Sequence, residues 1–226
     1  ERGIGVDLAT FEQLMQEHVF GPYGMNTSSY TWQPRFEADY AVGHAPDGKA
    51  YPKDKDNAAR APSTLETTTD DYARFMTAVL RGEGLSEASW NEIFKPQVRI
   101  RSRTQFGPGA SETTSVYDPI ELSYGLGWGL QRTPYGWGAF KEGHSEEGFE
   151  HYSIVFPGRG IGVLLMSNSA NGESIFKELL ELTGQMYRYH NELTSAHAAS
   201  SPWWAWPFDL KPVWFYQGGF GDGTSA

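Results

Sequence analysis

Polar side chains at residues 144–151 are of the types that bind metals or move protons. His144, Glu147 and His151 are spaced i, i+3 and i+7, which on a helix would place three ligands on one face. Glycines flank this stretch, and the β-rich residues 152–155 follow it, so the sequence favours strand, turn and strand instead. We therefore expect no metal site here. His144 is then either an active-site residue or a hydrogen-bonded structural histidine.

Tyr124 and Trp128 are interspersed with three glycines and form a second group of candidate site residues. They can line a substrate-facing strand, or they can be packing residues, with the glycines admitting bulky neighbours. The glycine pattern is G-x-G-x-G, which differs from the dinucleotide-binding fingerprint, and no βαβ unit surrounds it. The sequence therefore predicts no nucleotide cofactor.

The elements around these residues are predicted to be consecutive antiparallel strands between residues 124 and 168. Residues 157–160, Pro-Gly-Arg-Gly, are a strong hairpin signal between two apolar runs. Residues 163–166 are continuously apolar, which predicts a strand covered on both faces.

Helices are predicted on the borders of this sheet from apolar spacing of three and four residues. The predicted helices are 6–19, 68–81 with Thr69 as N-cap, 86–94 with Ser86 as N-cap, and 171–185. Residues 25–57 have no sustained period and are expected to be irregular. After Gly184 the chain becomes rich in Trp, Pro and Gly, so we expect one domain at 1–184 and a distinct tail at 185–226.

Composition excludes several classes of function. The 226 residues carry a net charge of −10 without a basic patch, which argues against nucleic-acid binding. There is no cysteine, which excludes disulfides, thiolate metal sites and a cysteine nucleophile. The longest apolar run is well below the roughly 18 residues that a membrane span needs. Residues 1–5 show no apolar leader, so we expect no signal peptide in this chain.

Five segments, in order and with sensible spacing, resemble one known family. Together they are similar to the C-terminal part of the serine β-lactamase and penicillin-binding-protein superfamily, in its β-lactamase-related esterase and peptidase branch. The segments are FEQLMQEHVFGPYGM (11–25), APSTLETTTDDYARFMTAVL (61–80), YGLGWGL (124–130), EGHSEEG (142–148) and GVLLMSNSANGESIFKELLEL (162–182). The resemblance covers about residues 6–183. It implies an α+β fold, with an antiparallel sheet flanked by helices, as an incomplete β-lactamase/transpeptidase-like fold.

The family uses three catalytic motifs: Ser-x-x-Lys, Tyr-x-Asn or Ser-x-Asn, and Lys-Thr-Gly or His-x-Gly on a strand. By resemblance, His144 stands at the Lys or His position of the third motif and Ser145 at the hydroxyl position. Glu147 follows, where a backbone N–H helps to form the oxyanion hole. Glu146 replaces the usual glycine, and its carboxylate would crowd the strand and repel an acidic substrate. This departure puts β-lactam binding in doubt more than ester or amide hydrolysis.

The first two motifs are expected before residue 1, because they precede the strand motif in the family. Two short matches occur after it instead, at Ser174–Lys177 and Tyr189–Asn191, in permuted order. We interpret both as helix surface and tail. The chain alone is therefore expected to be inactive, with the nucleophile supplied from elsewhere.

The resemblance implies a small-molecule amide or ester substrate once the site is completed. A rival hypothesis is a non-catalytic assembly subunit that self-associates, or that pairs with a chain supplying the missing N-terminal part. A third is a membrane-surface role for the tryptophan-rich tail. Residues 197–216 faintly resemble a loop of membrane-bound protein O-mannosyltransferases, a resemblance too short to imply transferase activity.

Overall fold

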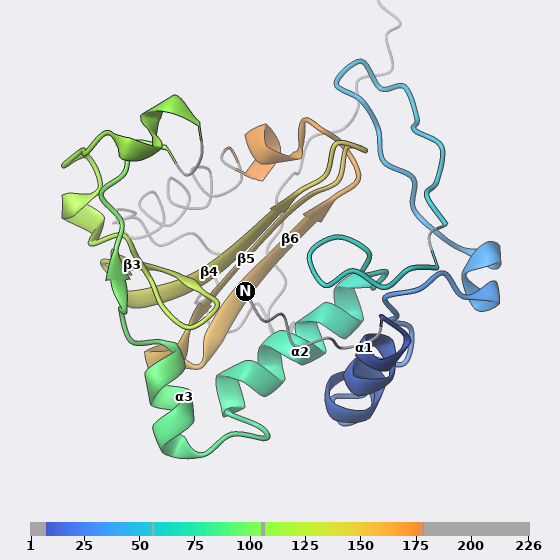
Figure 1. Ribbon diagram of the computed structural model, residues 1–226, viewed down its shortest axis with the longest axis horizontal. Helices are drawn as coiled ribbons and strands as arrows, with labels where there is room; N and C mark the ends of the chain where they lie inside the picture. The colour runs from blue at the N-terminus through green and yellow to red at the C-terminus, as the bar shows by residue number, and fades with distance from the viewer. Residues whose placement is uncertain (1–7, 56, 105–106, 177, 179–226) are drawn as a thin grey trace, which may run out of the picture. The chain divides into compact units, whose positions relative to one another are not determined.

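A computed structural model describes residues 8–55, 57–104, 107–176 and 178 (Figure 1). Contacts within the chain divide it into two units, Glu1–Lys177 and Glu178–Ala226. Everything below concerns the first unit. The predicted boundary near Gly184 and the predicted tail lie outside the described residues and stay predictions. No helix among the described residues is both long enough and apolar enough to cross a bilayer.

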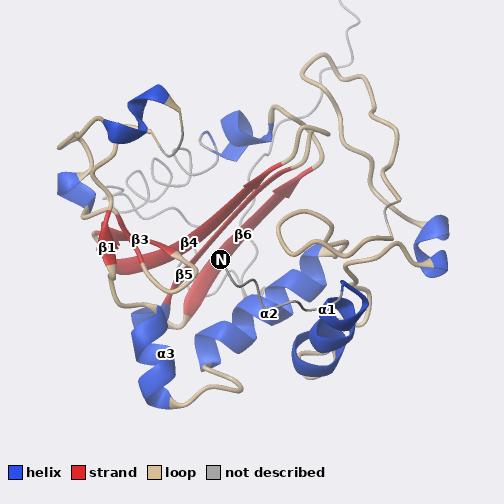
Figure 2. Ribbon diagram, in the orientation of Figure 1, coloured by secondary structure: helices blue, strands red, loops and turns tan. Residues whose placement is uncertain are grey.

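Six antiparallel strands form one sheet in the order β1-β2-β3-β4-β5-β6, so neighbours in the chain are neighbours in the sheet. The strands are β1 Val98–Arg99, β2 Ser123–Tyr124, β3 Gly129–Thr133, β4 Gly136–His144, β5 Glu150–Phe156 and β6 Ile161–Ser167. Helices border this sheet (Figure 2), so the predicted α+β fold is confirmed.

Residues 124–130 do not form the single strand that their pattern suggested. Tyr124 ends β2 and Gly129 begins β3, and the two strands pair with each other. Between them the Gly125 N–H donates to the Trp128 carbonyl at 2.8 Å, and Gly127 has a φ of 85°. A positive φ favours glycine, so Gly127 allows the chain to reverse here.

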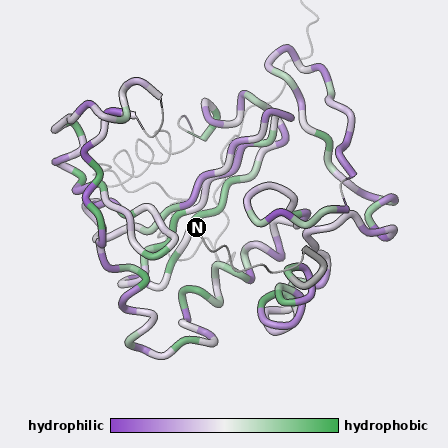
Figure 3. The backbone as a smooth tube through the Cα atoms, in the orientation of Figure 1, coloured by the Kyte–Doolittle hydropathy of each residue, from purple (hydrophilic) through white to green (hydrophobic). Residues whose placement is uncertain are grey.

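The predicted hairpin at residues 157–160 is confirmed. A short 3₁₀ turn at Pro157–Arg159 and a left-handed Gly160 (φ 65°) connect β5 to β6. The prediction that β6 is covered on both faces is wrong for the described residues: Ile161 is 54% exposed and Val163 is 39% exposed. An apolar run indicates that burial of the strand is favourable, but it does not specify what covers each face. Figure 3 shows β6 as a largely hydrophobic strand.

The α-helices with both ends in the described residues are α1 Leu8–Met15, α2 Thr69–Arg81 and α3 Glu87–Ile93, and residues 172–176, within the predicted helix 171–185, are helical as well. α1 continues into a π-helical turn at Gln16–Phe20. Thr68, not Thr69, caps α2, because the Thr68 side chain accepts from the Asp71 N–H. Ser86 caps α3 as predicted, accepting from the Ser89 N–H. Residues 25–55, within the stretch predicted to be irregular, are irregular apart from a 3₁₀ turn at Pro34–Ala38 and isolated bridges.

Helix α2 provides the main cover for the sheet. Its Met76 lies in a buried cluster with Leu130, Ala139 and Val155 from three neighbouring strands. A second cluster joins α1 to the following loop through Phe20, Met25, Tyr30 and Ala59, and Phe75 of α2 packs against both clusters. Helix α2 therefore connects the sheet to the α1 region.

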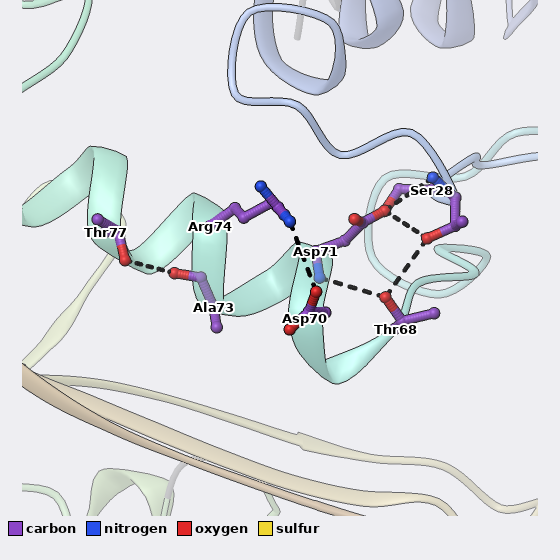
Figure 4. A network of polar contacts seen from close by, with 8 residues as sticks. Ser28, Thr68, Asp70, Asp71, Ala73, Arg74 and Thr77 are labelled. Atoms are coloured by element: carbon purple, nitrogen blue, oxygen red, sulfur yellow. Dashed lines mark hydrogen bonds and ion pairs between the residues drawn. The ribbon is translucent and has the colours of Figure 1, made fainter. Parts of the chain in front are cut away.

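A buried carboxylate ties the start of α2 to the loop after α1 (Figure 4). Asp71 is 5% exposed. Its Oδ2 accepts from the Thr27 N–H at 2.8 Å, the Thr27 hydroxyl at 2.6 Å and the Ser28 hydroxyl at 2.9 Å. Three donors on one buried oxygen hold the loop against the first turn of the helix.

Candidate functional site

The end of β4 has an unpaired edge among the described residues. Pairing with β3 reaches only as far as Gly129 opposite Phe140. Beyond Phe140, residues 141–144 pair with β5 on one side alone, and all four are exposed. A strand edge of this kind presents backbone N–H and C=O groups to whatever lies beside it.

A tight turn follows this edge and confirms the predicted strand, turn and strand. The Ser145 N–H donates to the Phe149 carbonyl at 2.9 Å, and the Gly148 N–H donates to the Ser145 carbonyl at 3.0 Å. The Glu147 N–H donates to Ser145 Oγ at 3.0 Å. In this conformation the Glu147 N–H is engaged within the turn, so its expected oxyanion role stays a prediction that requires the Ser145 hydroxyl to rotate away.

The turn is supported from outside by a loop that is distant in sequence. Gly43 lies so close to it that an added Cβ would be 1.7 Å from the Glu147 carbonyl oxygen. The neighbouring His44 donates from Nδ1 to the Asn168 carbonyl at 3.0 Å, and its own carbonyl accepts from the Ala170 N–H at 2.9 Å. This loop therefore joins the 145–148 turn to the residues that follow β6; Figure 1 shows it beside the ends of β4, β5 and β6.

A largely buried cation lies behind the turn. Lys53 Nζ contacts Glu66 Oε1 at 2.5 Å. The same Nζ lies 5.7 Å from the Phe149 ring centroid and 5.6 Å from that of Trp32. A cation–π contact with a desolvated lysine is attractive, so Lys53 stabilises the position of Phe149, the residue that closes the turn.

His144 ends β4 directly opposite Glu150, the first residue of β5. His144 Nδ1 and Glu150 Oε1 are 2.5 Å apart, with the imidazole side chain 70% exposed and the carboxylate side chain 10% exposed. Side chains alternate along a strand, so this pair lies on the sheet face opposite the one that α2 covers through Ala139 and Val155.

His151 lies on the other face by strand alternation, and its ring centroid is 6.1 Å from that of Phe149. Its Nδ1 is buried without a hydrogen-bond partner among the described residues. Burial lowers the pKa of His151, because the charged imidazolium loses hydration there. His144, Glu147 and His151 therefore do not share one face, and no group of three His, Cys, Asp or Glu residues in the described ranges could hold a metal ion.

Four of the six predicted site residues lie together in the structure, and the other two lie on different parts of the fold. His144, Ser145, Glu146 and Glu147 lie consecutively at the open edge, with the Glu146 carboxylate exposed. Trp128 is 8% exposed and packs in the core against Phe94 at a ring distance of 6.0 Å. Its position favours the packing interpretation. Tyr124 is exposed on β2, and its predicted contact with substrate stays a prediction.

Sequence reasoning missed Glu150. The signal that could have revealed it is the register of the hairpin: a turn closed by Ser145 and Phe149 puts residue 144 opposite residue 150. Of the two short motif matches, Ser174 is an exposed helical residue, whereas Lys177 and residues 189–191 lie outside the described ranges.

A separate hollow in the described surface lies away from residues 141–148. It has a volume of about 660 Å³, and aromatic side chains form much of its wall. Those side chains are Tyr23, Phe75, Trp90, Phe94 and Trp128. Trp90 Nε1 donates to the Val79 carbonyl and the Tyr23 hydroxyl to the Glu83 carbonyl, so both polar groups already have partners.

Comparison with known proteins gives one finding. A family model with the description Beta-lactamase matches residues 5–188. The match spans the whole described sheet and helices α1, α2 and α3, and it confirms the family resemblance seen in the five sequence segments. Residues 197–216, with their faint second resemblance, lie outside it. No curated protein matches the chain.

Proposed function

Because the chain belongs to the Beta-lactamase family, we propose that it is the C-terminal portion of a serine hydrolase that cleaves amide or ester bonds through an acyl-enzyme. The observation that carries this proposal is the open edge of β4 at residues 141–144, which ends on the exposed imidazole of His144. By resemblance, the family motif that faces the nucleophile begins at His144, the last residue of this edge.

Each part of this edge has a task in acyl transfer. Backbone N–H groups at the edge can stabilise the oxyanion of a tetrahedral intermediate. The exposed ring of His144 can orient the substrate or transfer a proton to or from it. In the completed enzyme, His144→Ala would lower kcat by about 100-fold.

The substrate is an uncharged or cationic ester or amide. Glu146 projects from the turn next to the proposed oxyanion side, and the chain has a net charge of −10. An acidic substrate would meet repulsion from both. Most β-lactams carry a carboxylate, so Glu146 favours esters and amides over β-lactams.

Ser174 is not the nucleophile in this proposal. Ser174 is the sole Ser-x-x-Lys serine in the 226-residue sequence, and it follows β6 on an exposed helical surface. We expect the purified chain to leave p-nitrophenyl acetate and nitrocefin at their buffer rates of hydrolysis, and Ser174→Ala to change nothing. Turnover by the wild-type chain that disappears in Ser174→Ala would refute this assignment.

A second candidate function is non-catalytic assembly, and the edge strand favours it. Within the described residues β6 has a neighbour on one side only, and Ile161 and Val163 are exposed on it. Such an edge pairs readily with another strand. The partner would be a second copy or a chain that supplies the missing N-terminal part.

Under the assembly hypothesis the isolated chain elutes from a size-exclusion column as a dimer or larger species. Val163→Lys should shift it toward the monomer, because a charge on an edge strand opposes pairing. Val116→Lys is the matched control, since Val116 is exposed in a turn and belongs to no strand. A monomer at every concentration tested would count against assembly through this edge.

A further inference from the structure

In the candidate site, the nearly buried carboxylate of Glu150 contacts the exposed imidazole of His144. The two residues are directly opposed across β4 and β5, with Nδ1 2.5 Å from Oε1. An ionised carboxylate has only acceptor positions, so the imidazole nitrogen facing it must carry the proton. The neutral ring is then protonated on Nδ1, and its Nε2 carries the free lone pair.

Glu150 is enclosed in a way that restricts its own side chain. On the β6 side it lies opposite Ser167. Gly172 lies against both residues, so close that an added Cβ would be 2.8 Å from Glu150 Cβ and 2.7 Å from Ser167 Cβ. The carboxylate thus projects from a packed site toward the solvent-exposed ring of His144, and it can fix that ring without moving itself.

We propose that Glu150 is the positioning residue of the site: it holds His144 as the Nδ1–H tautomer and directs Nε2 toward the substrate at the open edge of β4. The catalytic consequence rests on the proposed hydrolase function. Buried carboxylates that fix the tautomer of an exposed histidine are an established way to prepare a proton-transfer group. Glu150 does not reach the substrate and acts only through His144.

Imidazole nitrogen spectroscopy tests this assignment without any need for activity. Two-bond ¹H–¹⁵N correlation spectra of the full chain, recorded where His144 is neutral, give the ratio of its two tautomers. In the wild type we expect the Nδ1–H form to dominate. Glu150→Ala removes the acceptor and should move the ratio at least tenfold toward Nε2–H, the form that isolated imidazole side chains prefer.

Two further variants separate position from charge and from general disturbance. Glu150→Gln keeps an acceptor oxygen at the same place, so it should retain the Nδ1–H form. Glu142→Ala removes an exposed carboxylate two residues before His144 on the same strand face, and it should leave the ratio unchanged. If Glu150→Ala does not fold, the wild type and Glu150→Gln still decide the question.

A wild-type His144 in the Nε2–H form would overturn the assignment, as would a ratio that Glu150→Ala leaves unchanged. These spectra report only on the pair. Failure of the proposed hydrolase function would instead appear in the hydrolysis assays, with the tautomer ratio still as expected, so the two failures are distinguishable.

Discussion

Replacing Asp71 with alanine should lower the free energy of unfolding by about 3 kcal/mol, because it removes a buried, charged acceptor that three donors share. The Asp71 carboxylate accepts from the Thr27 N–H, the Thr27 hydroxyl and the Ser28 hydroxyl, and Ser28 is fully buried. The Ser28 hydroxyl would keep Thr67 Oγ1, at 2.8 Å, as a partner, so the main loss is the two hydrogen bonds from Thr27. Urea unfolding followed by circular dichroism measures the effect.

Asp70→Ala is the matched control for this prediction. Asp70 precedes Asp71 in the same first turn of α2 (Figure 4), but its side chain is 86% exposed and forms an i, i+4 ion pair with Arg74 at 3.5 Å. Exposed pairs of this kind contribute little, so the control should lose no more than about 0.5 kcal/mol. Equal losses in the two variants would show that the helix dipole, and not the buried network, provides the stabilisation.

Gly43→Ala should disrupt the candidate site itself. Its Cβ would lie 1.7 Å from the Glu147 carbonyl oxygen and 2.8 Å from the carbonyl carbon. Both atoms belong to the backbone, so neither can rotate out of the way, and the loop must separate from the 145–148 turn. We expect a loss of about 3 kcal/mol, at the upper end of overpacking effects. Backbone amide shifts at Ser145 and Gly148 should change with it.

Gly158→Ala provides the comparison, since an added Cβ there meets no atom within 4 Å and the residue has no positive φ. It should unfold at the same urea concentration as the wild type. If Gly43→Ala also unfolds there, with unchanged shifts at Ser145 and Gly148, the loop does not support the turn.

Local signals were sufficient to predict much of the fold. The apolar spacing in α2, the Ser86 cap of α3 and the Pro-Gly-Arg-Gly hairpin all depend on neighbouring residues, and the structure agrees with each. The cap of α2 was wrong by one residue, because Thr68 and Thr69 carry the same side chain and only the backbone geometry distinguishes them.

Features that depend on distant residues could not be predicted in this way. Periodicity could not show which face of β6 is covered, nor that Trp128 packs against Phe94. The support of the turn by Gly43 joins segments about a hundred residues apart, and the sequence contains no signal for that contact. The role of Glu150 depends on the register of β4 and β5, which places it opposite His144.

In the proposed hydrolase, substrate lies along the open edge of β4, at His144. Amide-resolved NMR titration of the chain with N-acetyl-alanine ethyl ester, a neutral ester, tests this directly, with the free acid as a weaker-binding comparison because of Glu146. We predict shifts concentrated at residues 141–147. Shifts that leave His144 and Ser145 unchanged, and that occur instead in the aromatic hollow around Trp90 and Trp128, would contradict the claim.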